Sequence, residues 1–173
     1  EALESYYEAY KKHSSQMWTE KLGLEELVAG DGELVSELTS ALQMVETDMT
    51  IFFRLLSSVE EPDVGHLRFA FYDEGAIPES EWNDWLGKWW NRAGGNPDRE
   101  GMRGANPRYV LRNWMAQLAI DAAEKEDYSV AIELHELLKS PYEEQPDYDE
   151  EWFMKRPEWA RHRVGCSMLS CSS

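Results

Sequence analysis

The chain has 173 residues, of which 34 are Asp or Glu and 17 are Lys or Arg, so its formal net charge is −17. Its length predicts about one domain, and its 42% apolar residues, with eight Trp, are enough for a buried core. The acidic excess argues against general binding to nucleic acid or to anionic membranes, because both need a basic surface. No apolar run approaches the roughly 20 residues that span a bilayer. No secretory signal or transit peptide opens the sequence, and because the first residue is Glu1 rather than Met we expect a processed chain or a piece of a longer one.

The spacing of apolar residues predicts helices from the start of the chain. A helix is expected over residues 2–20, and a shorter helical piece is expected over residues 24–29, between two glycines. Asp31 is placed to cap a long helix that ends near residue 57 and has apolar residues at steps of three or four. This long run is the strongest periodic signal in the sequence.

Polar residues interrupt the long run and the segment that follows it. Thr47, Asp48 and Thr50 are expected to bend or break the helix, because their side chains compete for backbone hydrogen bonds. Residues 60–64 form an acidic link that contains proline. Residues 67–72 are apolar and aromatic and fit either a short helix or an extended piece.

A tryptophan-rich helix is predicted over residues 79–92, with Pro78 just before its first turn. Its tryptophans fall at helical spacing, which is more typical of core or interface anchors than of a stacking platform for bases. Trp89 and Trp90 lie about 100° apart around a helix. One of these two side chains is therefore expected to be partly exposed.

The rest of the chain is predicted to be helical up to residue 140. Residues 91–106 are rich in Gly and Asn and predict a loop, whereas Asn106-Pro107 predicts the start of a helix that runs to about residue 126. Another helix is expected from Ser129 to the stop signal Ser140-Pro141.

The predicted fold class is mainly α, with about five to six helices and an irregular C-terminal tail, because no segment alternates long enough to predict a strand. Two domains are expected: a helical domain over residues 1–140 and a tail with Pro and aromatic residues over 141–173.

Motifs for catalysis or for metal binding are missing from the sequence. Glycines near residues 94–104 lack the spacing of a phosphate-binding loop. The histidines do not lie at helical or zinc-finger spacing, and His162, Cys166 and Cys171 together offer only three ligands where a structural zinc site needs four. Runs of acidic residues are expected to be solvated. We therefore predict no catalytic, cofactor-binding or metal-binding residue in this chain.

Arginines gather between residues 99 and 112, at positions 99, 103, 108 and 112. Arg108 and Arg112 would share one face of a helix. The group could form an anion site near a helix start, but pairing with carboxylates inside so acidic a chain is favoured.

The two cysteines, Cys166 and Cys171, both lie in the last eight residues, which fits a reducing compartment. Arg161, His162 and Arg163 supply positive charge nearby, and positive charge lowers the pKa of a thiol. Three interpretations stay open: a disulfide between the two, which needs a tight turn; a bond to a cysteine outside this chain; or two thiols without a special role.

Four segments resemble the selenoprotein O family: residues 21–24 (KLGL), 48–55 (DMTIFFRL), 106–113 (NPRYVLRN) and 166–173 (CSMLSCSS). They occur in the family's order and span the whole chain, so together they are specific.

The resemblance implies a kinase-like parent enzyme that transfers AMP from ATP to Ser, Thr or Tyr hydroxyls of proteins, with Mg or Mn. It implies an intracellular protein, cytoplasmic in bacteria and mitochondrial in eukaryotes. In some members the position of Cys171 holds selenocysteine, which implies a redox role for that end of the chain.

The family's nucleotide and metal residues belong to an upstream kinase-like region, and no segment here matches them. The resemblance therefore implies that this chain is the helical C-terminal part, inactive by itself. Its expected partners are that upstream region, protein substrates, and redox partners that reach Cys171. Cys166 is a local suggestion and not a residue that the family assigns.

Two other functions compete with this interpretation. One is an acidic, helical interaction module without chemistry. The other is a thiol-disulfide protein that acts through Cys166 and Cys171, although it lacks the CxxC spacing of thioredoxin-type motifs.

Overall fold

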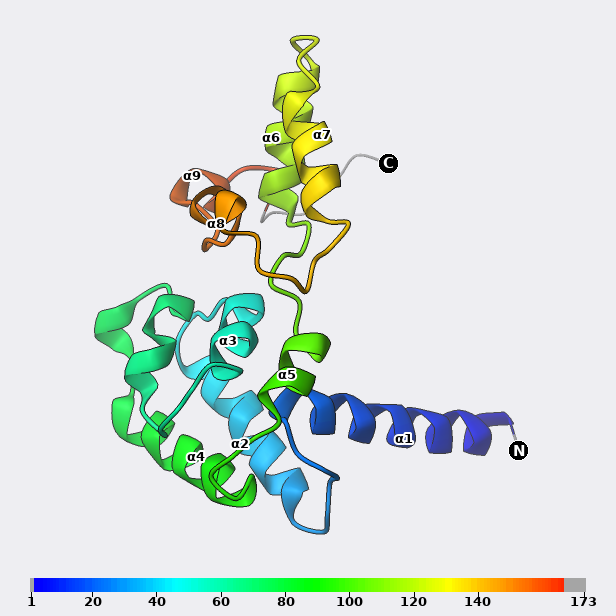
Figure 1. Cartoon of the computed structure of the whole chain (residues 1–173), viewed down its shortest axis with the longest axis vertical. Coiled ribbons are helices and arrows are strands. Elements are labelled where there is room, and N and C mark those ends of the chain that lie inside the picture. The colour runs from blue at the N-terminus through cyan, green and yellow to red at the C-terminus, as the bar shows by residue number, and fades with distance from the viewer. Residues whose placement is uncertain (1, 167–173) are drawn as a thin grey trace. The chain divides into compact units, whose positions relative to one another are not determined.

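The computed structural model describes residues 2–166, and over that range it is mainly helical (Figure 1). One β-type pairing within this range is an isolated bridge between Thr47 and Phe71. The predicted mainly α fold class is thus confirmed. None of the helices in the described part of the chain is long and apolar enough to cross a membrane.

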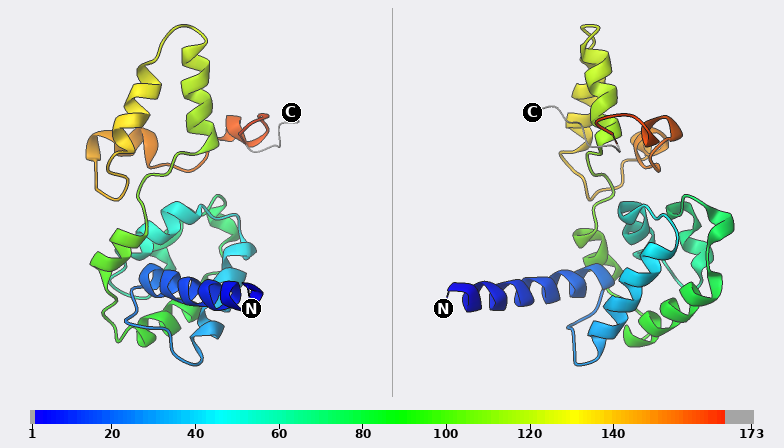
Figure 2. Two further views of the ribbon diagram at one scale, coloured as in Figure 1. Left: turned by 90° about the vertical axis from the view of Figure 1, so that its right-hand side faces the viewer. Right: turned by 180° about the vertical axis from the view of Figure 1, so that it is seen from behind.

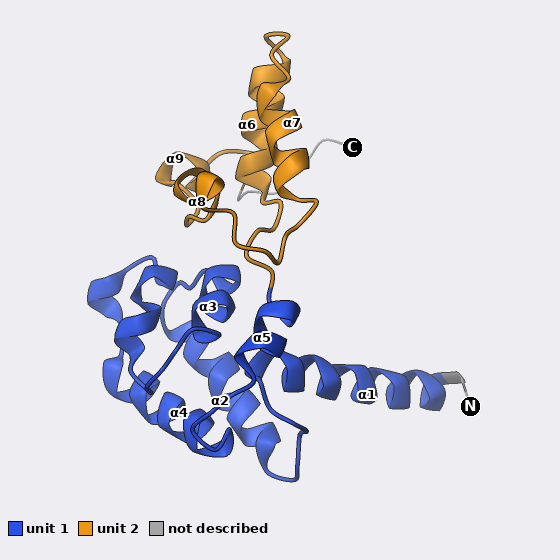
Figure 3. Cartoon of the chain, viewed as in Figure 1, with its two compact units in different colours: residues 1–106 blue, residues 107–173 orange. Residues whose placement is uncertain are grey.

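The chain forms two compact units, unit 1 over residues 1–106 and unit 2 over residues 107–173 (Figure 3). Unit 1 holds α1 (Ala2–Leu22), α2 (Asp31–Met44), α3 (Met49–Leu56), η1 (Val64–Ala70), η2 (Glu74–Ala76), α4 (Glu79–Arg92) and α5 (Arg99–Ala105). Unit 2 holds α6 (Asn113–Ala123), α7 (Ser129–Leu137), α8 (Pro146–Trp152) and α9 (Glu158–Arg161). The compact units therefore divide the chain after Asn106 rather than at residue 140.

Aromatic side chains form the core of unit 1. The ring of Trp82, which is fully buried, lies 5.3 Å from the rings of both Phe52 and Phe71. Two further tryptophans of α4 each donate a hydrogen bond of 2.9 Å from the indole nitrogen to a backbone carbonyl, Trp85 to Leu34 and Trp89 to Leu22. The tryptophans at these three positions are therefore core anchors, while Trp90 is partly exposed, as predicted.

The long helical run predicted up to residue 57 is broken into α2 and α3, as the polar residues in its middle indicated. The side chain of Asp48 accepts a hydrogen bond of 3.1 Å from the backbone N–H of Ile51 and so caps α3. Thr47 pairs with Phe71 in the isolated bridge. The helix begins anew at Met49 because Asp48 satisfies one of its free N–H groups.

The helix predicted over residues 24–29 is wrong. Gly23 and Gly30 both have positive φ, of 63° and 107°. Gly23 follows the last residue of α1, and Gly30 precedes the first residue of α2. The backbone N–H of Val28 donates to the side chain of Asp31 at 2.7 Å instead of to a helical carbonyl. Asp31 is the first residue of α2, so its carboxylate holds the preceding turn and is not the N-cap that the sequence predicted.

The loop predicted over residues 91–106 and the helix start predicted at Asn106-Pro107 are also wrong. A short helix, α5, occupies residues 99–105, and Asp98 caps it by accepting from the N–H of Gly101 at 2.9 Å. Residues 107–112 are not helical, because the N–H groups of Arg108 and Tyr109 both donate to the carbonyl of Pro141. The following helix therefore begins at Asn113.

Unit 2 is built on a hairpin of α6 and α7, which Figure 2 shows side by side. The rings of Trp114 on α6 and Trp152 on α8 stack at 6.0 Å, and both side chains are buried. The cluster around them contains Tyr109, Met115, Leu134, Leu137, Ala160 and Cys166. The tail predicted to be irregular thus contains two short helices whose apolar residues close this core.

Candidate functional site

Three of the four segments that carry the family resemblance meet at Asn106 in unit 1. The side-chain oxygen of Asn106 accepts from the Lys21 ammonium at 2.9 Å, and its side-chain nitrogen donates to the Lys21 carbonyl at 3.2 Å. The guanidinium of Arg54 donates to the carbonyls of Asn106 at 3.4 Å and Arg103 at 3.2 Å. Asn106 and Arg54 are buried, with exposed fractions of 1% and 3%. This junction joins the end of α1, the last turn of α3 and the end of α5.

The cations at this junction are only partly in contact with water. The Lys21 ammonium lies 4.5 Å from the centre of the Phe53 ring. Burial lowers the pKa of Lys21 below its ordinary value of 10.5. The side-chain oxygen of Asn106 accepts from Lys21, and the carbonyls of Arg103 and Asn106 accept from Arg54. The junction therefore joins backbone segments, and both of its cations are already bound within the chain.

Gly23, in the first of the family segments, lets α1 and α5 approach closely. Its carbonyl accepts a hydrogen bond of 3.0 Å from the N–H of Asp98. A Cβ atom at residue 23 would lie 2.7 Å from the Met102 sulfur and 2.9 Å from the Asp98 nitrogen. Only glycine fits this position without displacing backbone.

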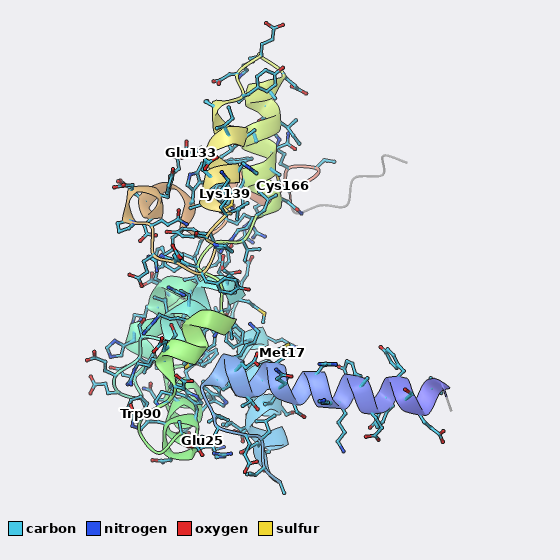
Figure 4. The ribbon with its side chains drawn as sticks, turned by 45° about the vertical axis from the view of Figure 1, so that its right-hand side comes forward. Met17, Glu25, Trp90, Glu133, Lys139 and Cys166 are labelled. Atoms are coloured by element: carbon cyan, nitrogen blue, oxygen red, sulfur yellow. The ribbon has the colours of Figure 1, made fainter. Side chains whose placement is uncertain are left out.

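A groove of about 730 Å³ lies beside Gly23 and contains Glu25, Glu26 and Asp98 among its lining residues. Figure 4 labels Glu25 at this edge of unit 1. Arg92 is the cation that lines this groove. Its guanidinium already donates to both carboxylate oxygens of Asp31, at 2.8 and 3.0 Å, and to the Glu26 carbonyl. The groove therefore has the charge of a solvated acidic surface and not of an anion site.

The arginines predicted to gather do not form one anion site. Arg108 pairs with Asp149 and lies 4.0 Å from the centre of the Phe153 ring, so the expected carboxylate pairing is confirmed for this residue. Arg99 instead donates to the Val59 carbonyl at 3.1 and 3.3 Å. Arg112 donates to the Met154 carbonyl at 3.1 Å. These guanidinium groups fasten loops within their own units.

Tyr109 shares the carboxylate of Asp149 with Arg108. The hydroxyl of Tyr109 donates to Asp149, and it accepts from the backbone N–H of Gln145 at 3.3 Å. Burial, followed by the hydrogen bond to Asp149, raises the pKa of Tyr109 above its usual value of 10.0. This contact ties residues 108–109 to α8, and Asp149 is a partner that the sequence alone did not indicate.

Cys166 is a free cysteine in the core of unit 2, with an exposed fraction of 8%. Figure 4 labels it next to the start of α6, where the side chain of Asn113 donates to the Cys166 carbonyl at 3.4 Å. Its N–H donates to the Arg163 carbonyl at 3.1 Å. Cys171, the other residue predicted to be redox-active, lies outside the described residues.

An ion pair fastens the segment before Cys166 to α6. The guanidinium of Arg163 donates to both oxygens of Asp121, at 2.7 and 2.8 Å, and Gln117 donates to the same carboxylate at 2.8 Å. The hydrogen bonds from Arg163 and Gln117 lower the pKa of Asp121. The positive charge expected to surround the cysteines is therefore already paired at Arg163.

Within residues 2–166, no group of three or more His, Cys, Asp or Glu side chains lies close enough together to hold a metal ion. The described part of the chain does not fit a divalent metal site, and we assign no metal-dependent step to its residues.

Comparison with known proteins shows the family to which the chain belongs. A family model described as protein adenylyltransferase SelO matches residues 1–139, and the chain belongs to this family. It is 46% identical to the protein nucleotidyltransferase YdiU of Flavobacterium johnsoniae, over 99% of this chain and 35% of that protein. The YdiU protein of Aromatoleum aromaticum is 43% identical over the whole chain and 35% of its own length. The chain thus spans about a third of the length of the curated relatives that it matches.

Proposed function

We propose that this chain is part of a protein adenylyltransferase that transfers AMP from ATP to Ser, Thr or Tyr hydroxyls of proteins. The observation that carries the proposal is the match of the SelO family model to residues 1–139. The junction at Asn106 supports it, because three segments with the family's sequence pattern contact one another there.

The reaction is a displacement at the α-phosphorus of ATP. The hydroxyl oxygen of the acceptor forms a bond to that phosphorus, and the bond from the phosphorus to the oxygen bridging to the β-phosphate breaks. Pyrophosphate leaves with the electron pair of that bond, and the hydroxyl proton passes to a base. Such transfers depend on positioning and on electrostatic stabilisation of the phosphate charge.

We assign the ATP contacts, and those of any Mg or Mn, to the part of the parent protein that this chain lacks. Support for this comes from Arg92, Arg99 and Arg108, whose guanidinium groups are bound to carbonyls or carboxylates of the chain itself. A kinase-like fold for that part is a prediction from the resemblance.

For this chain we propose a supporting role and a redox-sensitive end at Cys171. Unit 1 is a compact helical unit whose segments are joined at Asn106, and unit 2 anchors the segment before Cys166 through Arg163 and Asp121. Cys171 would then be the position that exchanges with a redox partner.

The test compares the parent protein with the 173-residue chain, using ATP labelled at the α-phosphate and a mixture of protein acceptors. The parent is expected to label protein and release pyrophosphate. The chain alone is expected to give no label above a buffer blank or a Cys171→Ser control. Label transferred by the chain alone would overturn the assignment of the nucleotide site, and a parent that labels no protein would overturn the proposed activity.

A further inference from the structure

The first half of α1 presents apolar side chains to solvent. Leu3, Tyr6, Tyr7 and Tyr10 have exposed fractions of 80%, 67%, 63% and 61%. We name these four residues the aromatic stripe. In Figures 1 and 2 this half of α1 extends away from the other helices of unit 1. The stripe is therefore a surface of unit 1 that its own helices leave open.

The stripe occupies one face of α1. At about 100° per residue, its four residues fall within an arc of about 100°. Glu8 and Lys12 lie on the opposite face, whereas Glu4 and Lys11 flank the stripe on the side of Tyr7. Tyr6 and Tyr10 stack with their ring centres 6.4 Å apart. This is the pattern of an amphipathic helix that expects a partner on its apolar face.

The same face of α1 packs against unit 1 farther along the helix. Trp18 lies only about 20° around the helix from Tyr7. Its ring contacts Phe53 in the core, with 6.2 Å between ring centres. The second half of α1 is thus held by its apolar face, and the first half offers a continuation of that face.

The exposed stripe is large for a protein of this size. Three tyrosines and a leucine at these exposures present roughly 500 Å² of surface, near the upper end of the patches found on monomers. Residues 2–14 would form a helix of about 20 Å without tertiary packing, a length that is marginally stable in water. Both facts indicate that something covers the stripe in the working protein.

We propose that the aromatic stripe is the docking surface for the part of the parent polypeptide that this chain lacks. The proposal rests on the proposed function in one respect, that the chain is a part of a longer protein. The relatives are about three times as long as the segment that they share with this chain, so a large body of polypeptide is available as the occupant. Tyrosine-rich, uncharged surfaces are enriched in protein interfaces.

A second copy of the chain is the weaker candidate for this position. Each copy carries a formal net charge of −17. Two such chains repel each other, and a net charge this far from zero favours a monomer. The occupant is therefore expected to present an apolar surface from the same polypeptide.

The test measures hydrogen exchange of residues 4–14 in the parent protein and in the 173-residue chain. We expect the amides of this segment to exchange at least about 100-fold more slowly in the parent, because packing makes a marginal helix stable. Hydroxyl-radical labelling of Tyr6, Tyr7 and Tyr10 should fall several-fold in the parent. Acetylation of Lys12, on the opposite face, and exchange of the buried α3 amides are the internal controls.

A matched pair of variants tests which face is used. In the parent, Tyr6→Ala with Tyr10→Ala should lower the melting temperature by about 4 °C or more, whereas Glu8→Ala with Lys12→Ala should lower it by less than about 1 °C. In the 173-residue chain, each of these two double variants should change the melting temperature by less than about 1 °C. If the tyrosine pair prevents the parent from folding, the exchange and labelling of the unmodified protein still decide the question.

Equal exchange and labelling in the parent and in the chain would overturn the proposal. So would protection in the isolated chain that grows with its concentration, because a second copy would then be the occupant. None of these measurements reads AMP transfer. An inactive parent with a protected stripe would count only against the proposed function, and an active parent with an open stripe only against the docking surface.

Discussion

Two glycines of unit 1 have nearly the same left-handed backbone but different surroundings. Gly23 has a φ of 63° and Gly94 a φ of 64°. A Cβ at Gly23 would lie 2.8 Å from the Met102 side-chain carbon and 2.9 Å from the backbone nitrogen of Asp98. At Gly94, no described atom beyond its own neighbours would come within 4 Å of the Cβ. Gly23→Ala should therefore destabilise unit 1 much more than Gly94→Ala.

The expected difference follows from the contacts. An alanine in the left-handed conformation destabilises the folded state by about 1–2 kcal/mol relative to glycine. Alanine also lowers the entropy of the unfolded chain, which stabilises the fold by about 0.4–1 kcal/mol, so Gly94→Ala should lower the free energy of unfolding by about 1 kcal/mol. At Gly23 the overlap adds about 1–3 kcal/mol, because Met102 is fully buried and the Asp98 nitrogen is held by its hydrogen bond to Gly23. We expect a total of about 2–4 kcal/mol for Gly23→Ala.

Urea unfolding of the 173-residue chain, followed by hydrogen exchange of the α3 amides, reports on unit 1 alone. Because the two glycines have nearly the same φ, the backbone cost of alanine is similar in both variants. The difference between their free energies of unfolding therefore measures the close approach of α1 and α5. If the two variants agree within about 0.5 kcal/mol, the close approach at Gly23 is refuted.

Three further predictions test other contacts. Asn106→Ala should destabilise unit 1 by about 2–4 kcal/mol in urea unfolding, because it leaves the Lys21 ammonium and carbonyl without partners; a loss below about 1 kcal/mol would contradict this. Burial alone would raise the pKa of Asp31, but hydrogen bonds from Arg92 and Val28 hold it below 3.8, so its contribution to stability is present above pH 3.8 and is lost as the pH falls through the folded-state pKa. Arg92→Met should cost about 2 kcal/mol at pH 7 and raise that pKa, and an unchanged acid unfolding curve would count against the pair. Alkylation of Cys166 in the folded chain should be at least about tenfold slower than in urea, because the side chain is buried; equal rates, measured by mass spectrometry, would show that the core of unit 2 does not cover it.

The spacing of apolar residues predicted correctly those helices that begin and end at local signals, such as a proline or a capping side chain. The helix over residues 79–92 begins and ends where Pro78 and its tryptophan spacing indicated, and the break near Asp48 follows from its cap. The failures came where distant backbone decides. Residues 107–112 are not helical, because the Pro141 carbonyl accepts the N–H groups of Arg108 and Tyr109, and a partner 33 or 32 residues away leaves no local signal.

The sequence showed the three family segments that form the junction at Asn106, but it did not show that they contact one another. Lys21, Arg54 and Asn106 are brought together by the packing of α1, α3 and α5, and their spacing along the chain contains no period that shows it. The pairing of Arg108 was predicted in kind, but Asp149 could not be chosen among so many carboxylates. The burial of Cys166 also could not be predicted, because Trp114 and Trp152, which belong to the same core cluster, lie far from it along the sequence.

The central claim is that the chain is part of an enzyme that transfers AMP to proteins. The most direct measurement gives the parent protein ATP labelled at either the α- or the γ-phosphate and follows the label into protein hydroxyls. Transfer of the α-label alone, with release of pyrophosphate, is the result that we predict. Transfer of the γ-label, or of neither label, would contradict the claim.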